Sequence, residues 1–197
     1  MSKTIEFYYD FGSSNAYIAY TQLPKLIERT KAEIIYKPAL IGGVFKETGN
    51  RAPLTVPSKF KWMHEDSKRY FDMWGIRPLK INSHFPMNTV YLMRGALYAQ
   101  QEGFLDIYNK AIFEAMWLHD KNLTAPDVVS EVLTAAGLDP EPIMAATQEA
   151  LFKKALFDVT AEAVERGVFG MPTFFVGDEM HFGKDRLQWV VMAAEKL

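Results

Sequence analysis

The sequence predicts an α/β fold in which a long helical block separates two groups of strands. Bulky, strand-like segments occur at residues 5–9 and 33–37, strand signals are missing from residues 58–166, and two further strands follow at 173–176 and 179–182. The chain has 197 residues, of which 49% are hydrophobic, so it can bury a full core. We therefore expect one domain, or one domain that carries a large insertion.

The N-terminal part of the chain has the pattern of a β-α-β unit. Ile5 to Tyr9 is bulky and aromatic like a buried strand, and apolar residues then recur at helical spacing over residues 17–27. Glu33 to Lys37 is the second strand, and Pro38 ends it. Pro24 lies inside the helical segment, where it removes one backbone donor and crowds the preceding turn. We therefore expect this helix to bend.

The middle of the chain, residues 58–166, indicates helices joined by loops that contain glycine or proline. One helix is expected to start at Thr124, whose hydroxyl would cap it, with Pro126 in the first turn and Asp127 three residues after the cap. The run Glu165-Arg166-Gly167 predicts a helix end, because a cation lies in the last turn and a glycine follows. Strand signals return directly after this glycine.

The C-terminal part of the chain completes the pattern. Two strands flank Gly177-Asp178, a two-residue hairpin signal, and an amphipathic helix covers residues 187–194. The order strand, helix, strand, helical block, strand, strand, helix is that of a thioredoxin-like fold with a large all-helical insertion. We therefore predict a thioredoxin-like domain formed by residues 1–41 and 167–197, and an inserted helical domain formed by residues 42–166.

Composition excludes several classes of partner. The net charge of −2 and the absence of a Lys/Arg-rich run argue against nucleic acid, because phosphate binding needs a basic patch. The longest apolar runs fall far short of the ~20 residues that span a bilayer. The N-terminus lacks the features of a secretory signal, so we expect a cytoplasmic protein. The four histidines show no paired ligand spacing and the chain has no cysteine, so no metal site is predicted.

The junction of the first strand and the first helix resembles a thiol site that lacks its own thiol. Ser13-Ser14-Asn15-Ala16 stands at this junction, and the distant segment 170–176 is its expected partner. Serine and alanine hold the positions of a Cys-x-x-Cys pair, so a disulfide mechanism within the protein is excluded. If a sulfur reacts here, it must arrive on a ligand, and glutathione is the obvious candidate.

A serine at a helix start is chemically adequate to activate a bound thiol. Ionising a thiol of pKa ~8.5 at neutral pH requires a stabilisation of ~2.7 kcal/mol. A helix terminus contributes ~0.3–1 kcal/mol, and a hydroxyl hydrogen bond to a charged acceptor adds ~1.5–3 kcal/mol. The alternative is that Ser13 or Ser14 only caps the helix.

Met171-Pro172 lies between the end of the helical block and a new strand, with Gly170 before it. This is a plausible place for a cis peptide bond, which would leave the amide and the carbonyl of Met171 pointing outward. These groups would pair with a peptide-like ligand as an added strand does, and glutathione is a peptide.

Four segments in the same order resemble the 2-hydroxychromene-2-carboxylate isomerases and the kappa-class glutathione transferases, which share a DsbA-like thioredoxin fold. They are Asp10 to Ser13 with Tyr17, Gly42 to Asn50, Gly167 to Thr173, and Phe182 to Arg186. The resemblance covers the chain from end to end. It implies a thioredoxin fold with an inserted helical domain, glutathione as cofactor and a homodimer.

The resemblance assigns the sulfur end of glutathione to two motifs. It implies that Ser13 hydrogen bonds the sulfur and is the catalytic residue, and that Met171, before Pro172, pairs through its backbone with the cysteinyl part. The family usually has proline after the activating serine, whereas this chain has Ser14. Either hydroxyl is therefore a candidate to face the sulfur.

The resemblance also assigns the two ends of the tripeptide. Asn50 would contact it, and Lys59 matches a basic residue near the glycine carboxylate. Lys184 and Asp185 would hold the γ-glutamyl end, which carries an ammonium as well as a carboxylate. The alternatives are that Asn50, Lys59 and Lys184 are surface residues, and that Asp185 caps the last helix, with Gln188 three residues later.

The resulting hypothesis is a glutathione-dependent isomerase of an aromatic hydroxy acid, acting by reversible thiolate addition. A second hypothesis is a kappa-like transferase or peroxidase that consumes glutathione, and a third is a non-catalytic module that binds extended peptides. The helical insertion is rich in aromatic residues, most of which we expect in the core and a few beside a flat aromatic substrate: Trp62, Tyr70, Phe71, Trp74, Phe85, Tyr91, Phe113 and Trp117.

Overall fold

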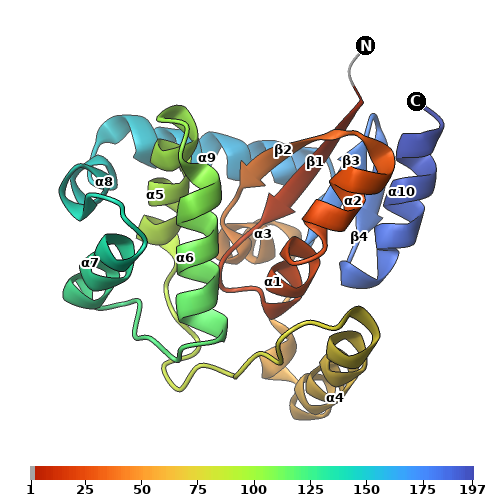
Figure 1. The fold of residues 1–197 in the computed structure, drawn as a ribbon, viewed down its shortest axis with the longest axis horizontal. Coiled ribbons are helices and arrows are strands. Elements are labelled where there is room, and N and C mark those ends of the chain that lie inside the picture. The colour runs from red at the N-terminus through yellow and green to blue at the C-terminus, as the bar shows by residue number, and fades with distance from the viewer. Residues whose placement is uncertain (1–2) are drawn as a thin grey trace.

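The computed structural model describes residues 3–197 and has a four-stranded mixed sheet at its centre (Figure 1). The strand order is β2-β1-β3-β4. β1 (Thr4–Tyr9) runs parallel to β2 (Glu33–Pro38), and β3 (Thr173–Val176) runs antiparallel to β1 and to β4 (Glu179–Phe182). The strands begin and end within one residue of the predicted limits, and the thioredoxin-like fold is confirmed.

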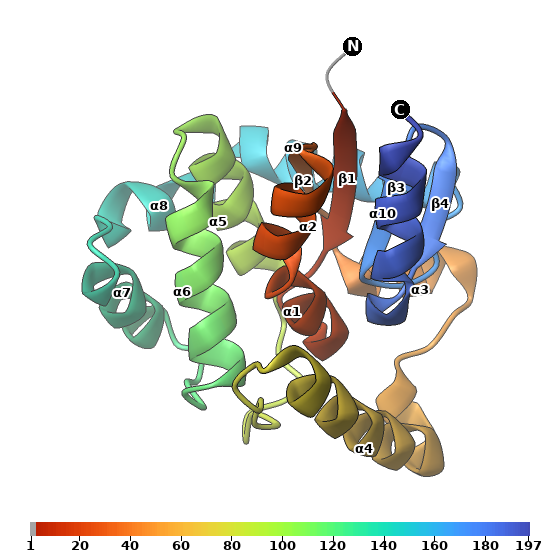
Figure 2. The same ribbon diagram turned by 45° about the vertical axis from the view of Figure 1, so that its right-hand side comes forward.

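Helices cover both faces of the sheet because β1 alternates between two cores. Phe7 and Tyr9 pack into the larger core, where the ring of Phe7 stacks on that of Phe174 at 5.0 Å. Tyr8 points into the smaller core beside Phe175. Figures 1 and 2 show the helices of the first face, α1 (Ser14–Tyr20), α2 (Leu23–Thr30) and α10 (Leu187–Glu195), and those of the second, α3 (Ile41–Thr48) and α9 (Ala150–Glu165).

The expected bend at Pro24 is instead a complete break. α1 ends at Tyr20, and α2 starts at Leu23 with Pro24 in its first turn. In a continuous helix the Pro24 nitrogen would have to donate to the carbonyl of Tyr20, which proline cannot do. In a first turn no such donor is needed, so the chain restarts the helix there. The prediction of one bent helix was therefore wrong.

Six α-helices lie between β2 and β3 in addition to α3, all within the described residues. All of them contribute to the larger core: α5 (Val90–Gln101), α6 (Leu105–Trp117), α7 (Pro126–Ala135) and α8 (Pro140–Ala146) line it, while α9 adds Leu156 and α4 (Pro57–Trp74) adds Phe71. α4 projects from this body, and its main neighbour is the short 3₁₀ helix Pro53–Thr55 (Figure 2). No helix within residues 3–197 combines the length and the apolar character needed to cross a membrane. The limits of an inserted domain remain a prediction.

Two predicted helix ends in this block had different outcomes. α9 ends at Glu165, followed by Gly167 with φ 87°, as predicted. α7 has Ala125 at its N-cap and no side-chain cap, so the predicted cap at Thr124 was wrong. The Thr124 hydroxyl instead donates to Asn122 Oδ1 at 2.6 Å, because the preceding turn offers a nearer acceptor.

Candidate active site

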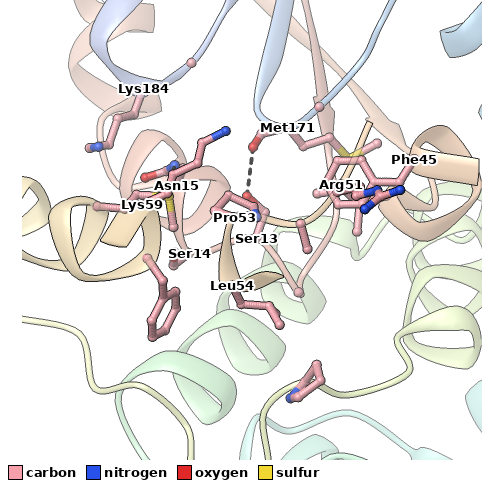
Figure 3. Close-up of a pocket in the computed structure, with 18 of the residues that line it drawn as sticks. Ser13, Ser14, Asn15, Phe45, Arg51, Pro53, Leu54, Lys59, Met171 and Lys184 are labelled. Atoms are coloured by element: carbon pink, nitrogen blue, oxygen red, sulfur yellow. Dashed lines mark hydrogen bonds between the residues drawn. The ribbon is translucent and has the colours of Figure 1, made fainter. Parts of the chain in front are cut away.

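The Ser13 side chain is held where β1 passes into α1. Its backbone is extended (φ −98°, ψ 109°), which makes it the N-cap of α1, and its Oγ accepts a hydrogen bond from the Ala16 amide at 3.1 Å. The same hydroxyl donates to the carbonyl oxygen of Met171 at 2.9 Å, 158 residues away in sequence (Figure 3). The fold thus brings the two predicted motifs together. Ser13 caps the helix and also faces the loop that precedes β3.

A buried carboxylate below Ser13 fixes this turn. The Asp10 side chain is fully buried, and its two oxygens accept hydrogen bonds from the backbone amides of Gly12 and Ile41, each at 2.8 Å. Burial raises the pKa of the Asp10 carboxyl, while the Ile41 and Gly12 amides and the Thr89 side chain oppose this shift. Asp10 therefore ties the β1–α1 turn to the start of α3. Sequence reasoning missed this role because the donor at Ile41 is distant along the chain.

The peptide bond between Met171 and Pro172 is cis, as predicted. The Met171 carbonyl is occupied by Ser13, whereas its amide makes no hydrogen bond within residues 3–197. Pro172 is buried and does not line the cavity, and its carbonyl accepts from the Gly183 amide at 2.9 Å. Pro172 therefore shapes the loop, and Met171 is the residue that presents a free backbone donor.

Ser13 opens into a cavity of about 870 Å³. This volume is within the range of small-molecule sites, ~300–1,000 Å³. Of the aromatic residues singled out in the sequence, Trp62, Phe85 and Trp117 line the cavity, whereas Phe71 and Phe113 lie in the core. Apolar side chains form much of the remaining wall: Phe45, Leu54, Phe60, Leu79, Ile81 and Met87. The cavity is therefore suited to a flat apolar group beside Ser13.

Asn50 and Lys59 both line the cavity, and both are exposed. The Asn50 side-chain amide donates to the Phe169 carbonyl at 2.7 Å, and its oxygen accepts from the Arg51 amide at 2.8 Å. Asn50 thus joins the end of α3 to the loop of Met171. The Lys59 amine has no hydrogen-bond or ion-pair partner in the described part of the chain, so it is free to meet an anion.

Lys184 lines the cavity but is committed to an internal ion pair. Only 5% of the residue is exposed, which excludes the surface alternative. Its Nζ lies 3.0 Å from Asp66 Oδ2 and 4.4 Å from the centre of the Tyr70 ring. This contact joins α4 to the 3₁₀ helix Lys184–Arg186. Direct contact between Lys184 and a ligand carboxylate would compete with Asp66.

Asp185 is exposed at the edge of the cavity and pairs with Arg186 at 2.6 Å. It does not cap the last helix: α10 starts at Leu187, its N-cap is Arg186, and no side chain caps it. The capping alternative was therefore wrong, because Asp185 is itself part of the 3₁₀ turn Lys184–Arg186 that precedes the helix. At the cavity rim the exposed carboxylate of Asp185 is shared with the Arg186 guanidinium.

The polar cavity residues that were not predicted as ligands include Asn15, Arg51 and Asp66. Asn15 Oδ1 is buried without a hydrogen-bond partner, and Nδ2 reaches only the Met63 sulfur at 3.6 Å. Asp66 lies on the same face of α4 as Lys59 and Met63, because these residues are spaced by four and then three positions. This helical spacing is visible in the sequence and could have indicated Asp66. Arg51 and Asn15 have no comparable sequence signal.

Comparisons with known proteins identify the family and agree with the fold. The family model of the DSBA-like thioredoxin domain matches residues 4–193. A 2-hydroxychromene-2-carboxylate isomerase from Pseudomonas putida is 30% identical over 198 residues, which cover 98% of this chain and 95% of that protein. The kappa 1 glutathione S-transferase of Caenorhabditis elegans is 28% identical over 204 residues, with coverage of 93% and 90%.

A solved structure of a 2-hydroxychromene-2-carboxylate isomerase superposes with a TM-score of 0.87 at 27% identity, covering 98% of this chain and 95% of that one. Sequence and structure relatives therefore agree over nearly the whole chain. The protein belongs to the DSBA-like thioredoxin family, among the relatives of the 2-hydroxychromene-2-carboxylate isomerases and the kappa glutathione transferases.

Proposed function

We propose that this protein is a glutathione-dependent isomerase of an aromatic hydroxy acid of the 2-hydroxychromene-2-carboxylate type. The observation that carries the proposal is the Ser13 hydroxyl, bonded to the Met171 carbonyl and open to a large cavity in a chain without cysteine. The named isomerase relatives match over almost their whole length, which supports the same chemistry.

The residues around Ser13 fit glutathione. The unpaired Met171 amide is a donor for the cysteinyl carbonyl, and the free Lys59 amine is a partner for the glycine carboxylate, with Asn50 nearby. Asp185 lies at the rim as an acceptor for the γ-glutamyl ammonium, and Lys184 places a cation close to it. Lys184 is already neutralised by Asp66. We therefore assign it two roles: its ion pair positions this rim, and its charge lies close to the γ-glutamyl end of the ligand.

When bound, glutathione would supply a thiolate that adds reversibly to a conjugated double bond, permits rotation about it, and leaves unchanged. The Ser13 hydroxyl has one proton, which it now donates to Met171. A rotation about its Cβ–Oγ bond would redirect that proton to the sulfur, while the Ala16 amide keeps the oxygen in place. Ser14 is half-buried on the cavity wall, one residue further, and is the alternative donor.

The proposal is tested by mixing the protein with 2-hydroxychromene-2-carboxylate and a small fraction of an equivalent of glutathione. An isomerase carries the substrate to its equilibrium with the product, through many turnovers per glutathione, and leaves the free thiol unchanged, as counted with a thiol reagent. A kappa-like transferase or peroxidase, which the kappa relatives make the second candidate, stops when glutathione is consumed. No conversion and no thiol loss with any electrophile would contradict both enzyme functions.

The third hypothesis, a peptide-binding module, predicts that extended peptides bind at Met171 while Ser13→Ala changes no activity. The cytoplasmic location and the homodimer implied by the resemblance remain predictions. Light scattering coupled to gel filtration at several protein concentrations measures the second of these directly, and a mass of one chain at all concentrations would exclude the dimer.

A further inference from the structure

A cluster of paired charges lies outside the cavity, on the second face of the sheet. Arg166 Nη1 lies 2.6 Å from Glu6 Oε2 and donates to the Tyr8 hydroxyl at 2.9 Å. That hydroxyl donates to Glu162 Oε1 at 2.9 Å, and the Lys37 amine lies 2.9 Å from Glu162 and 3.5 Å from Glu6. We call these five residues the Arg166 cluster. It joins β1 and β2 to the end of α9.

The Arg166 cluster is more shielded than a set of solvated surface ion pairs. Tyr8 is fully buried, and the side chains of Glu6, Lys37 and Arg166 are only 23–26% exposed. Burial and the hydrogen bond to Glu162 raise the pKa of the Tyr8 phenol, so this hydroxyl keeps its proton and donates to one partner while it accepts from the other. Because the contacts share partners, the cluster holds its geometry as a unit.

The cluster stands at the base of both segments that form the Ser13 site. The chain leaves the cluster at Tyr8 and reaches Ser13 five residues later, and it leaves the cluster at Arg166 and reaches Met171 five residues later. The Ser13 hydroxyl and the Met171 carbonyl then meet at 2.9 Å. The hydrogen bond between Tyr8 and Arg166 therefore fixes the starting points of these two short segments relative to each other.

Arg166 also packs against the core that holds Met171. Its guanidinium lies 3.8 Å from the centre of the Phe175 ring. Phe175, Val168 and Met171 belong to the smaller core, and each is at most 4% exposed. Since a close-packed core transmits small displacements, a shift of Arg166 would reach the Met171 side chain through Phe175. The cluster therefore acts on the Met171 loop through packing as well as along the chain.

The position of the Met171 loop matters because it carries a hydrogen-bond donor for the ligand. The Met171 amide makes no hydrogen bond within residues 3–197, and it is the donor that we assign to the cysteinyl carbonyl of glutathione. A hydrogen bond weakens steeply when its donor is displaced or turned. The affinity for the tripeptide should therefore depend on where the segment 167–171 begins, and Arg166 sets that place.

We propose that the Arg166 cluster positions the Met171 loop against the Ser13 turn, and that Tyr8 and Arg166 are thereby positioning residues for glutathione binding, although neither lines the cavity. This inference rests on the proposed function, because glutathione is the ligand whose affinity the cluster would set. It extends the site to residues on the second face of the sheet.

The test compares variants of two neighbouring residues of β1. Tyr8→Phe removes the hydroxyl from the cluster, and Tyr9→Phe removes the hydroxyl that donates to Asn109 at 2.7 Å in the larger core. Each variant loses one buried phenol hydroxyl, so Tyr9→Phe is the matched control for a loss of stability. Calorimetric binding of S-methylglutathione to the folded proteins should weaken about fivefold in Tyr8→Phe and change by less than about twofold in Tyr9→Phe.

Variants of Arg166 sharpen the comparison. Arg166→Met should weaken binding about tenfold, and Arg166→Lys, which keeps the charge but loses the planar fork, should recover part of the loss. In turnover assays the loss should appear in KM for glutathione with kcat nearly unchanged, because the Ser13 contact with Ala16 is retained. Wild-type affinity in Tyr8→Phe and Arg166→Met, with a loss only in the free energy of unfolding, would show that the cluster merely joins α9 to the sheet, and would overturn the proposal.

Hydrogen exchange in the protein without ligand keeps the two proposals distinguishable. The amides of residues 167–171 should exchange faster in Tyr8→Phe than in wild type or Tyr9→Phe. If wild type fails to bind S-methylglutathione, the proposed function fails and the exchange alone decides on the cluster. Faster exchange in this segment would then still support its positioning of the Met171 loop, and unchanged exchange would overturn it.

Discussion

The floor and the wall of the cavity are built differently. On the floor, the Asp10 and Ser13 side chains are buried, and Asp10 accepts two backbone amides while Ser13 bonds Ala16 and Met171. On the wall, Arg51 and Lys59 are exposed and unpaired within the described residues, and α4 projects from the body of the molecule. The floor is fixed by the end of the sheet, whereas the wall is adjustable.

This difference suggests separate roles: the floor stabilises the thiolate, and the wall selects the substrate. A hydroxyl that stabilises a thiolate must be held in one geometry, because misplacement by a fraction of a bond length weakens the hydrogen bond. Side chains that select a substrate gain from being free until the ligand arrives, since an internal partner would compete with it. We therefore expect floor variants to affect chemistry and folding, and wall variants to affect binding.

The largest effect is expected at Ser13. Ser13→Ala removes the hydroxyl that is proposed to donate a charge-assisted hydrogen bond to the sulfur, and should lower kcat/KM about a hundredfold. Ser14→Ala is the matched control and should leave most of the activity. Steady-state kinetics with glutathione and 2-hydroxychromene-2-carboxylate measure both. Equal losses, or a larger loss in Ser14→Ala, would move the catalytic role to Ser14.

The next effect is expected at Asp10. Asp10→Asn keeps the shape but turns one acceptor into a donor facing a backbone amide, so folding should lose about 2 kcal/mol. The apparent affinity for glutathione should fall as well, because the Ser13 turn and the start of α3 lose their common anchor. Urea unfolding and a glutathione titration check the two effects. Unchanged stability would show that the turn does not depend on this carboxylate.

The third effect is expected at the Lys184–Asp66 ion pair, which holds α4 of the wall against the rim of the cavity. Lys184→Met leaves Asp66 largely buried without its main partner and should cost about 2 kcal/mol, whereas the double variant Lys184→Met/Asp66→Leu should recover most of it. Hydrogen exchange along α4 should rise in the single variant. The thiolate signal from bound glutathione should change little. Additive losses in the double variant would mean that the pair does not join α4 to the rim.

The pH dependence of folding stability through Asp10 should be a smaller effect, and its direction follows from the pKa shift. Burial raises the pKa of the Asp10 carboxyl in the folded protein above its unfolded value of about 3.9. At a pH between these two values, Asp10 is more often protonated in the native protein than in the unfolded chain. Through this group, stability increases as pH falls across this range. The stability of wild type minus that of Asp10→Asn should therefore grow on acidification. A difference that shrinks would mean that the hydrogen bonds outweigh burial.

The smallest effect is expected at Asn15. Asn15→Leu removes an amide whose oxygen has no partner and whose nitrogen reaches only the Met63 sulfur. Met63→Leu removes the same contact from the other side. If Asn15 only supports α4, both variants should change glutathione affinity by less than about threefold and to the same extent. A larger effect of Asn15→Leu alone, measured by calorimetry, would identify a direct contact with the ligand.

The meeting of Ser13 and Met171 on the floor was predictable from sequence, whereas the role of Asp10 and the internal pairing of the wall residues were not. Strand limits, the hairpin at Gly177-Asp178 and the cis bond before Pro172 follow from local signals, and the fold order then brings Ser13 to Met171. The break before Pro24 follows from the same donor rule that predicted a bend, applied to a chain that has a turn available at Thr21 and Gln22.

The wall depends on contacts that no local pattern encodes. The partner of Lys184 is Asp66, 118 residues earlier, and only the packing of α4 beside the 3₁₀ turn brings the two together. The alternative that Asp185 caps the last helix was wrong because the same residue pattern fits a helix start and a 3₁₀ turn. Long-range pairing therefore sets the limit of what the sequence alone can predict here.

The central claim is that Ser13 holds a bound thiol as its thiolate. We would titrate wild type and Ser13→Ala with glutathione at neutral pH and record thiolate absorbance in the ultraviolet. The account predicts a saturable thiolate band in wild type that shrinks strongly in Ser13→Ala while the tripeptide still binds. Bound glutathione that remains a thiol in wild type, or an equal band in both proteins, would contradict it.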